Sequence, residues 1–596
     1  ISTALKVKRR CGSRRSSTSR AKKTNCAGAL AAMAVRSPEI EARVQDVRYV
    51  HQKSWRRSNG RFVEERRAYV VNEPVKLRVW IGPRRAGVET AVSPFPDSQL
   101  PWNRARHRLQ LVLHEPYQFA EPLLGELLLP HDGDSSRAEF VFAPKLASDF
   151  RARLMVLHRG RVLQTVVLCA DVLESALHLP SARGRIHCEE ESRLRGDWSD
   201  LGSRRRFDLA MVFNHALAGE PRLTGVAAQR AWATDLSGIE EPVREINDLI
   251  SAVASKVADH GDGLDQGDNP SLLVQLARVG ADLYSKLYLD QLQQLTAGGL
   301  DVGNEAVTHV QVVSTRSDAL VPIEFFYDYR PPDDGARVCP QHQQALAEGR
   351  CPDSCEGRAE PAAYVCPMGF WSLKKVIERH FYSAAVGKPD GAELVVQAEP
   401  TIQRERLQLR QGVLLAHSQE VSDEDVEPLL RLLNDAVGGA AGVARDWNEW
   451  RQQVLAGPGL LLAFPHNEGS KQNVRLEIGG SFLPTLRLPP DYVRAPGAGP
   501  PLVFLLGCDT AGTAEDYANH VRYFRQAGAA AVVSTIATVF GPHAVTVGEK
   551  IVKKLLTAEG GELLGEIMRD AKREALRESV PMALCVVAFG DADWRL

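Results

Sequence analysis

The first part of the chain alternates apolar and polar positions with the two-residue period of a β-strand. The alternation is clearest in two stretches, with apolar positions at Val75, Leu77, Val79 and Ile81 and at Leu109, Leu111 and Leu113. A third stretch, 152–172, is rich in strand-forming residues and is divided by Arg159-Gly160, as in a hairpin. Short strands separated by turns predict an all-β sandwich domain over residues 38–180.

A connecting region over 181–300 changes from the strand period to the helix period. Residues 207–214 predict one strand. Apolar residues then recur at helical spacing at Ile239, Val243, Ile246, Ile250, Val253 and Val257. A second helix is predicted from Asn269-Pro270, with an apolar face formed by Leu272, Leu273, Leu276, Leu283 and Leu287. We interpret both amphipathic helices as core packing that leads into the next domain.

Residues 301–596 contain short, uncharged apolar runs that predict the buried strands of a mostly parallel sheet. One run, 460–465, stops at His466, and another, 502–506, stops at Gly507-Cys508. In open α/β sheets, ligands and chemistry lie beyond the carboxyl ends of the strands. A thiol and an imidazole at that edge are the parts of a cysteine nucleophile and its base. The alternative is that Cys508 is a small buried apolar residue.

The residues around Cys508 carry a family resemblance. The segment Gly507-Cys508-Asp509-Thr510 is similar to the Ala-Cys-Glu-Thr-Gly that ends an apolar strand in CHAT domains, the caspase-like cysteine peptidases of the separase and caspase clan. Other segments that resemble this family are Gln526-Ala527-Gly528-Ala529, Val532-Val533-Ser534, Val321-Pro322-Ile323-Glu324-Phe325-Phe326 and 589–596. The resemblance covers about residues 300 to 596. It implies an α/β caspase-like fold, with a mostly parallel sheet flanked by helices. It also implies a cysteine endopeptidase that cleaves a protein substrate through a Cys-His dyad, triggered in a bacterial regulatory or defence pathway.

The candidate base, His466, departs from the family pattern, which places Gly directly after the catalytic His. In this chain Asn467 follows instead. His417, which ends another apolar run, and His543, in Phe540-Gly541-Pro542-His543, are alternative bases. We rank His466 first because its strand immediately precedes the Cys508 strand in the expected order of the sheet.

Neighbouring residues are expected to complete this site. A helix predicted over 514–526 begins just beyond Cys508, and both a helix N-terminus and an imidazolium favour the thiolate. Gly507, Asp509 and Asn467 are candidates for the oxyanion hole and the substrate pocket. Asp509 is alternatively a turn residue that caps its own backbone. The changed residue after the histidine leaves a second hypothesis: a catalytically inactive CHAT-fold protein that acts as an interaction or scaffold module.

Four cysteines lie within 28 residues in an insert over 331–370, and tetrahedral Zn²⁺ takes four thiolates. They are Cys339, Cys351, Cys355 and Cys366. His342 is an alternative ligand in place of one cysteine. A closed four-ligand zinc site is structural, since it leaves no open position for chemistry. The competing interpretation is four free thiols in a loop. After the insert, a helix-like run is expected over 373–381.

Composition supports a globular protein and excludes several classes. Of the 596 residues, 44% are hydrophobic and 25% are charged, as in ordinary globular domains. No stretch resembles a membrane span. Ten cysteines, four of them grouped as metal ligands, favour a reducing cytosol over a disulfide framework. We therefore expect a cytoplasmic protein that does not contact a membrane.

Charge is unevenly distributed along the chain. The segment 1–37 holds ten Lys or Arg and no acid, whereas the remainder carries 63 basic and 74 acidic residues. This basic tail lacks hydrophobic periodicity and is expected to be disordered. Nucleic-acid binding or a transit segment are other interpretations of it, and Met33 is an alternative start. Because the remainder is acidic, nucleic acid is not expected as a partner. The expected partners are a protein substrate and an activating protein bound through the β-sandwich domain.

Overall fold

The computed structural model describes most of the chain from residue 47 onward. The described residues are 47–86, 89–90, 95, 106–119, 121–181, 184–193, 204–214, 222–227, 230–255, 263–289, 306–314, 321–381, 395–396, 406–468, 475–484, 488–509, 514–536, 539, 541–558 and 560–596. The basic tail, 1–37, lies outside them.

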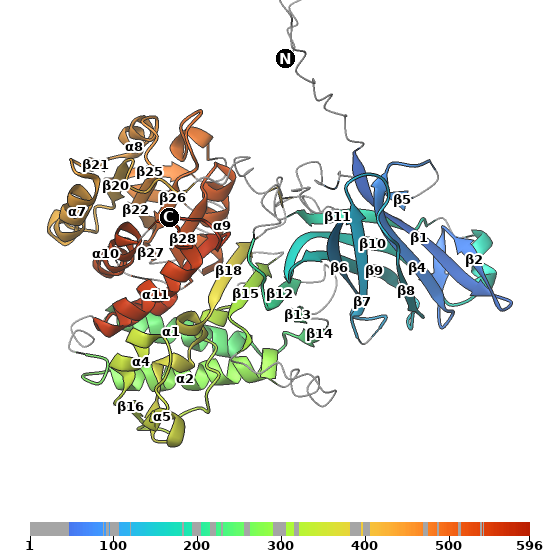
Figure 1. Cartoon of the computed structure of the whole chain (residues 1–596), viewed down its shortest axis with the longest axis horizontal. Helices are drawn as coiled ribbons and strands as arrows, with labels where there is room; N and C mark the ends of the chain where they lie inside the picture. Colours follow the sequence, from blue (N-terminus) through green and yellow to red (C-terminus); the bar gives the residue numbers. More distant parts are fainter. Residues whose placement is uncertain are drawn as a thin grey trace, which may run out of the picture. The chain divides into compact units, whose positions relative to one another are not determined.

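Two sheets form the N-terminal part (Figure 1). Among the described strands, the first sheet has the order β2-β1-β4-β8, with β5 paired to β1. Its strands are β1 (Arg48–Ser58), β2 (Arg61–Glu65), β4 (Val75–Pro83), β5 (Glu89–Thr90) and β8 (Ala138–Phe142). The second sheet has the order β19-β11-β10-β9-β6-β7, with β3 paired to β10. Its strands are β3 (Ala68–Val70), β6 (Arg106–His114), β7 (Leu123–Pro130), β9 (Asp149–His158), β10 (Arg161–Leu173), β11 (His187–Arg193) and β19 (Val395–Val396).

Side chains from both sheets share one hydrophobic core. The seven apolar positions predicted on strand faces over 75–81 and 109–113 all lie in this core, because a strand sends alternate side chains to opposite faces. The predicted hairpin over 152–172 is confirmed as β9 and β10. Its turn residues, Arg159 and Gly160, have φ of 51° and 76°. A short 3₁₀ helix, Ala176–Ser181, follows β10.

A mixed sheet of eleven described strands runs through the C-terminal part, in the order β14-β13-β12-β15-β18-β29-β28-β26-β22-β20-β21. Of these strands, β13 and β29 run against the others. The strands are β12 (Leu209–Asn214), β13 (Arg222–Ala227), β14 (Arg230–Asp235), β15 (His309–Ser314), β18 (Val376–Phe381), β20 (Val413–His417), β21 (Gly442–Val443), β22 (Leu460–Phe464), β26 (Leu502–Leu505), β28 (Ala531–Thr535) and β29 (Val586–Gly590). The predicted strands at 207–214, 460–465 and 502–506 are present, and the last two are parallel neighbours as expected.

Helices pack against this sheet and complete its core (Figure 1). They are α1 (Glu240–Ser255), α2 (Asn269–Tyr284), α7 (Asp423–Val437), α8 (Trp447–Val454), α9 (Ala514–Gln526), α10 (Gly541–Thr557) and α11 (Leu564–Arg577). A π-helical turn, Ser285–Leu289, extends α2. The predicted helices over 269–287 and 514–526 are confirmed, and the one over 239–257 is confirmed up to residue 255, since 256–257 lie outside the described residues. Among the described helices, none has the length and apolar character needed to cross a bilayer.

The helix-like run expected over 373–381 is wrong. A single helical turn, α6 (Trp371–Lys374), is followed by strand β18 in the middle of the sheet. Three consecutive charged or titratable residues of β18, Glu378, Arg379 and His380, are buried. Such a polar run does not indicate a central strand, because burying a charge destabilises the fold unless the charge is paired. Here the partners come from distant segments.

These partners form a buried ionic network between the N-terminal sheets and the large sheet. Arg161 lies 3.3 Å from the Glu378 carboxylate and 2.8 Å from that of Asp593, and Arg204 lies 2.5 Å from that of Asp591. Burial acts to raise the pKa of Glu378, but Arg161 and its other partners hold that pKa below its usual value. The neighbouring residue on β18, Arg379, pairs with the equally buried Glu324 at 2.6 Å.

Candidate active site and candidate metal centre

Beyond the edge of the large sheet, the chain segments that follow two of its strands form part of a smaller sheet. Beyond β22 lies β23 (His466–Glu468), and beyond β26 lies β27 (Cys508–Asp509). The main strands pair in parallel with Leu460 opposite Leu502, and the short ones with His466 opposite Cys508. Both pairs are separated by the same number of residues, so the register is kept along the whole length. Neighbouring strands lie roughly 5 Å apart, so the backbones at 466 and 508 are adjacent.

The junction between the long and short strands explains why position 507 is a glycine. Leu506 donates its backbone N–H to the Ala463 carbonyl at 3.1 Å, which keeps the two strands together past their apolar runs. A Cβ atom at position 507 would come within 2.1 Å of the Pro465 carbonyl oxygen. Glycine is therefore required there for close backbone approach.

A hairpin supports β23 from its other side. In the small sheet the order is β25-β24-β23-β27, with β24 (Arg475–Ile478) and β25 (Ser481–Pro484). His466 pairs with Glu477, and the neighbouring Leu476 accepts a hydrogen bond at 2.8 Å from the buried indole of Trp447. The backbone that carries His466 is thus held on both edges.

The candidate histidines differ in their surroundings. The imidazole of His466 is half-buried, and its Nδ1 has no hydrogen-bond partner among the described residues. Both nitrogens of His417, at the end of β20, have neighbours: Nε2 lies 3.3 Å from Asp423 and Nδ1 lies 3.1 Å from the Ser418 carbonyl. His543 lies in the first turn of α10. Of the two strand-end histidines, His466 therefore has a buried nitrogen that no described residue contacts by a hydrogen bond.

Asn467 is buried, and its side chain contacts a histidine that the sequence analysis did not single out. Its Oδ1 lies 3.2 Å from Nε2 of His520 on α9. Burial lowers the pKa of His520 to about 3, so its neutral ring donates Nε2–H to the amide oxygen. His520 falls in a polar stretch of its helix, and only the packing of α9 on β23 reveals it.

The backbones of Cys508 and Asp509 are described, whereas their side chains and residues 510–513 lie outside the described part of the chain. Helix α9 begins at Ala514, as predicted. The roles expected for these two side chains therefore stay predictions.

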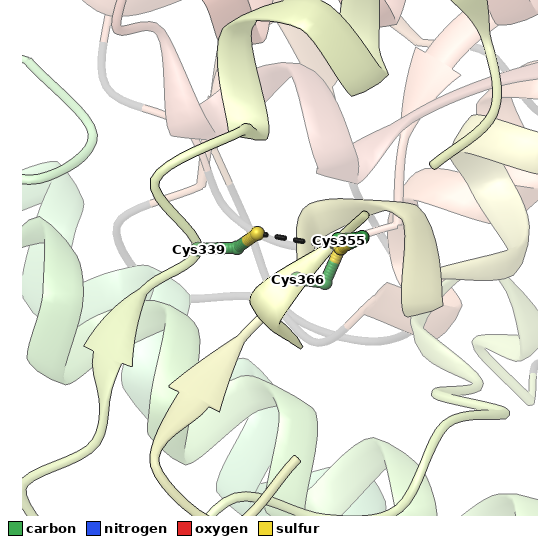
Figure 2. A group of neighbouring side chains, drawn as sticks. All are labelled: Cys339, Cys355 and Cys366. Atoms are coloured by element: carbon green, nitrogen blue, oxygen red, sulfur yellow. Dashed lines mark hydrogen bonds between the residues drawn. The ribbon is translucent and has the colours of Figure 1, made fainter. Parts of the chain in front are cut away.

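The insert brings its four cysteines together. Cys339 and Cys355 have their Sγ atoms 3.4 Å apart, and Cys351 and Cys366 have theirs 3.2 Å apart. All four are free thiols and buried. Figure 2 shows the side chains of Cys339, Cys355 and Cys366 pointing toward one another, and their Sγ atoms all lie within 4.8 Å. This cluster could hold a metal ion.

Short elements bend the chain around the cluster. The paired strands β16 (Arg337–Val338) and β17 (Tyr364–Val365) end just before Cys339 and Cys366, and the other two thiols lie between α4 (His342–Glu348) and α5 (Glu356–Ala359). A 3₁₀ turn, Pro367–Gly369, follows.

The surroundings favour the ionised form of Cys339, Cys351 and Cys355, whereas hydrogen bonds to these three raise the pKa of Cys366. The pKa of Cys355 is lowered to about 5, mainly by a hydrogen bond from the Cys366 thiol. The backbone N–H of Arg358 lowers this pKa further. Gly357 packs directly on the cluster, since a Cβ there would lie 3.3 Å from Sγ of Cys339. His342, the alternative ligand, places Nδ1 2.9 Å from the Cys339 carbonyl oxygen.

Comparison with known proteins finds remote likenesses. No family model matches the chain. A curated relative, a probable protease of Vitiosangium sp., is 28% identical over 352 residues, which are 53% of this chain and 43% of the relative's length. Thus less than half of that relative is matched.

Two solved structures are similar at low scores. The Arg-specific cysteine proteinase gingipain R is 12% identical, with 60% of this chain and 76% of that chain covered and a TM-score of 0.31. The Saccharomyces cerevisiae separase–securin complex is 10% identical, with 64% and 30% covered and a TM-score of 0.29. TM-scores of this size are too low to carry a conclusion about function.

Proposed function

We propose that the chain is a cysteine endopeptidase in which Cys508 is the nucleophile and His466 is the base. The observation that carries this proposal is the parallel register that pairs His466 with Cys508 at the carboxyl edge of the sheet. The buried Nδ1 of His466, which has no hydrogen-bond partner among the described residues, and the similarity to a probable protease support it. The CHAT family and the caspase-like fold belong to the same proposal.

In this mechanism the Cys508 thiolate attacks the carbonyl carbon of the scissile peptide and a C–S bond forms. The electron pair of the carbonyl moves to oxygen, and backbone N–H groups beside Cys508 stabilise that oxyanion. When the intermediate collapses, the amine leaves with a proton from the His466 imidazolium. Water, deprotonated by His466, then hydrolyses the thioester and restores the thiol.

A triggered role in bacterial regulation or defence fits this chemistry, since an uncontrolled protease damages its own cell. We interpret the two N-terminal sheets with their shared core as a sandwich that docks an activating protein partner. The rival function, an inactive scaffold, requires only the fold and no reactive thiol.

Two measurements on wild type and Cys508→Ala separate enzyme from scaffold. The first maps new protein N-termini by mass spectrometry after expression in cells. We expect at least one terminus with wild type and none with the variant. The second follows iodoacetamide labelling of each cysteine, and we expect Cys508 to react fastest at pH 6.5. Identical termini in both samples, together with slow labelling of Cys508, would establish the scaffold.

We also propose that the insert cysteines bind one structural Zn²⁺. Four sulfurs at about 2.3 Å from a tetrahedral ion lie roughly 3.8 Å apart, close to the spacings of the two thiol pairs. Four protein ligands leave no position for substrate, so the ion would supply folding energy rather than catalysis. Elemental analysis of protein purified without chelators should find about one zinc per chain. Finding no metal would contradict this site.

A further inference from the structure

A cavity of about 700 Å³ lies between the N-terminal sheets and the first strands of the large sheet, apart from the residues of the candidate active site. Its walls come from β6, β7, the turn between β9 and β10, the segment before β12, and β13. Small-molecule sites in proteins usually measure about 300–1,000 Å³, so this cavity has the size of a ligand site.

Arginine dominates its lining. Among the described residues, four arginines line the cavity: Arg106, Arg108, Arg159 and Arg206. The one lining acid among the described residues is Glu126, and its carboxylate already lies 3.1 Å from Nε of Arg108. Such a group is unusual in a chain whose residues after 37 are acidic overall. Like charges around one space repel one another, and a bound anion relieves that repulsion.

Two of these arginines have side chains without a polar contact to any described residue. Arg106 and Arg206 are exposed, and neither forms an ion pair or a side-chain hydrogen bond within the part of the chain that the structure describes. They reach the cavity from different segments, the start of β6 and the residues before β12. The lining also has an apolar part, which includes Leu124 and Val226.

We propose that this cavity binds a nucleoside di- or triphosphate. Guanidinium groups match phosphate oxygens with two parallel hydrogen bonds, a contact that Arg106 and Arg206 make with no described residue. Orthophosphate would fill little of the volume, whereas a base and ribose occupy the apolar wall beside Leu124 and Val226. The size, the charge and the apolar wall together select a nucleotide over an inorganic polyanion.

Residues that line the cavity are close in sequence to residues of the buried ionic network. Arg159 and Gly160 directly precede Arg161, and Arg206 follows Arg204 by two residues. Arg161 and Arg204 pair with acids of the C-terminal part. A nucleotide held from both sides would therefore stabilise the contact between the N-terminal sheets and the large sheet, and would raise the melting temperature.

Calorimetric titration and thermal melting of the full chain test this site with ATP, inorganic tripolyphosphate and orthophosphate as probes. ATP should bind most tightly and raise the melting temperature. In the double variant Arg106→Gln, Arg206→Gln, ATP affinity should fall at least about tenfold, since two charge-assisted contacts are lost. Both side chains are exposed, so the variant should melt like wild type without ligand. Arg431→Gln removes an exposed arginine from α7 and is the matched control, with unchanged ATP affinity.

Three results would overturn the proposal. The first is no binding of ATP by the wild type. The second is equal ATP affinity in the double variant and the control, which would place the ligand elsewhere. The third is tight binding of a single-stranded RNA of about 20 nucleotides without binding of ATP, which would make the arginines part of a nucleic-acid surface. None of these results depends on whether Cys508 is catalytic.

Discussion

Cys508 and the four cysteines of the insert lie in different parts of the fold. The backbone of Cys508 is at the end of a strand, with the backbone of His466 beside it and a helix beginning six residues later. The insert cysteines lie together, buried, with their sulfurs close to one another. A thiolate needs positive charge nearby. In our proposal the His466 imidazolium supplies it at the sheet edge, and a bound cation supplies it in the insert.

In our proposal, position in the fold decides what each thiol does. A thiolate with no bound cation keeps its electron pair for a substrate. Four thiolates that share a cation are held deprotonated but are not nucleophiles toward substrate. We therefore expect the two regions to respond in opposite ways to alkylation, chelation and substitution.

The largest effect should come from His466→Ala. Loss of the base leaves less thiolate at Cys508 and no proton for the leaving amine, so cleavage should fall about 10³-fold or more. Iodoacetamide labelling of Cys508 at pH 6.5 should slow at least about tenfold, while zinc content stays unchanged. The matched control is His417→Ala, whose imidazole already has Asp423 and Ser418 as neighbours. Activity lost with His417→Ala but kept with His466→Ala would move the base to β20.

Cys366→Ser should affect the other region. Its Sγ is buried in the cluster and contacts that of Cys351, so we expect most of the zinc to be lost. The melting temperature should fall by about 5–10 °C, because metal binding and local folding are coupled. Cys508 should remain the fastest-labelled cysteine.

Cys585→Ala serves as the control for this variant, because Cys585 is a buried thiol outside the cluster and should keep one zinc per chain. Full metal content in Cys366→Ser would show that the cluster is a group of free thiols.

The smallest effect concerns His520. Because burial lowers its pKa to about 3, the folded protein keeps this ring neutral where the unfolded chain protonates it, below about pH 6.5. The stability contributed by the neutral ring is therefore lost as pH falls from about 6.5 toward 3, at roughly 1.4 kcal/mol per pH unit.

His520→Gln keeps an N–H donor for Asn467 and removes this titration. We expect activity within about threefold of wild type. Its melting temperature should also fall less steeply between pH 6.5 and 4 than that of wild type. Parallel melting curves of variant and wild type across this range would show that His520 does not titrate as a buried ring.

Local sequence patterns predict much of this structure. The apolar runs at 460–465 and 502–506 predict strands because a buried strand needs uninterrupted apolar residues, and the helix over 514–526 follows from the same kind of local signal. The spacing of the four insert cysteines predicts that they meet, since 28 residues of loop and short elements can fold back on themselves. These features depend on neighbours along the chain, so the sequence alone determined them.

Other features were decided only by the tertiary structure, because their partners are far apart in the chain. Strand β18 carries buried charges that are stable only beside Arg161, Arg204 and Glu324, and the pattern at 376–381 contains no sign of them. The buried Nδ1 of His466, unpaired among the described residues, and the paired nitrogens of His417 depend on packing beyond each apolar run. The bond between Asn467 and His520 joins residues that no local pattern connects. Burial and pairing across a sheet are set by register between distant segments, and that register exists only in the folded chain.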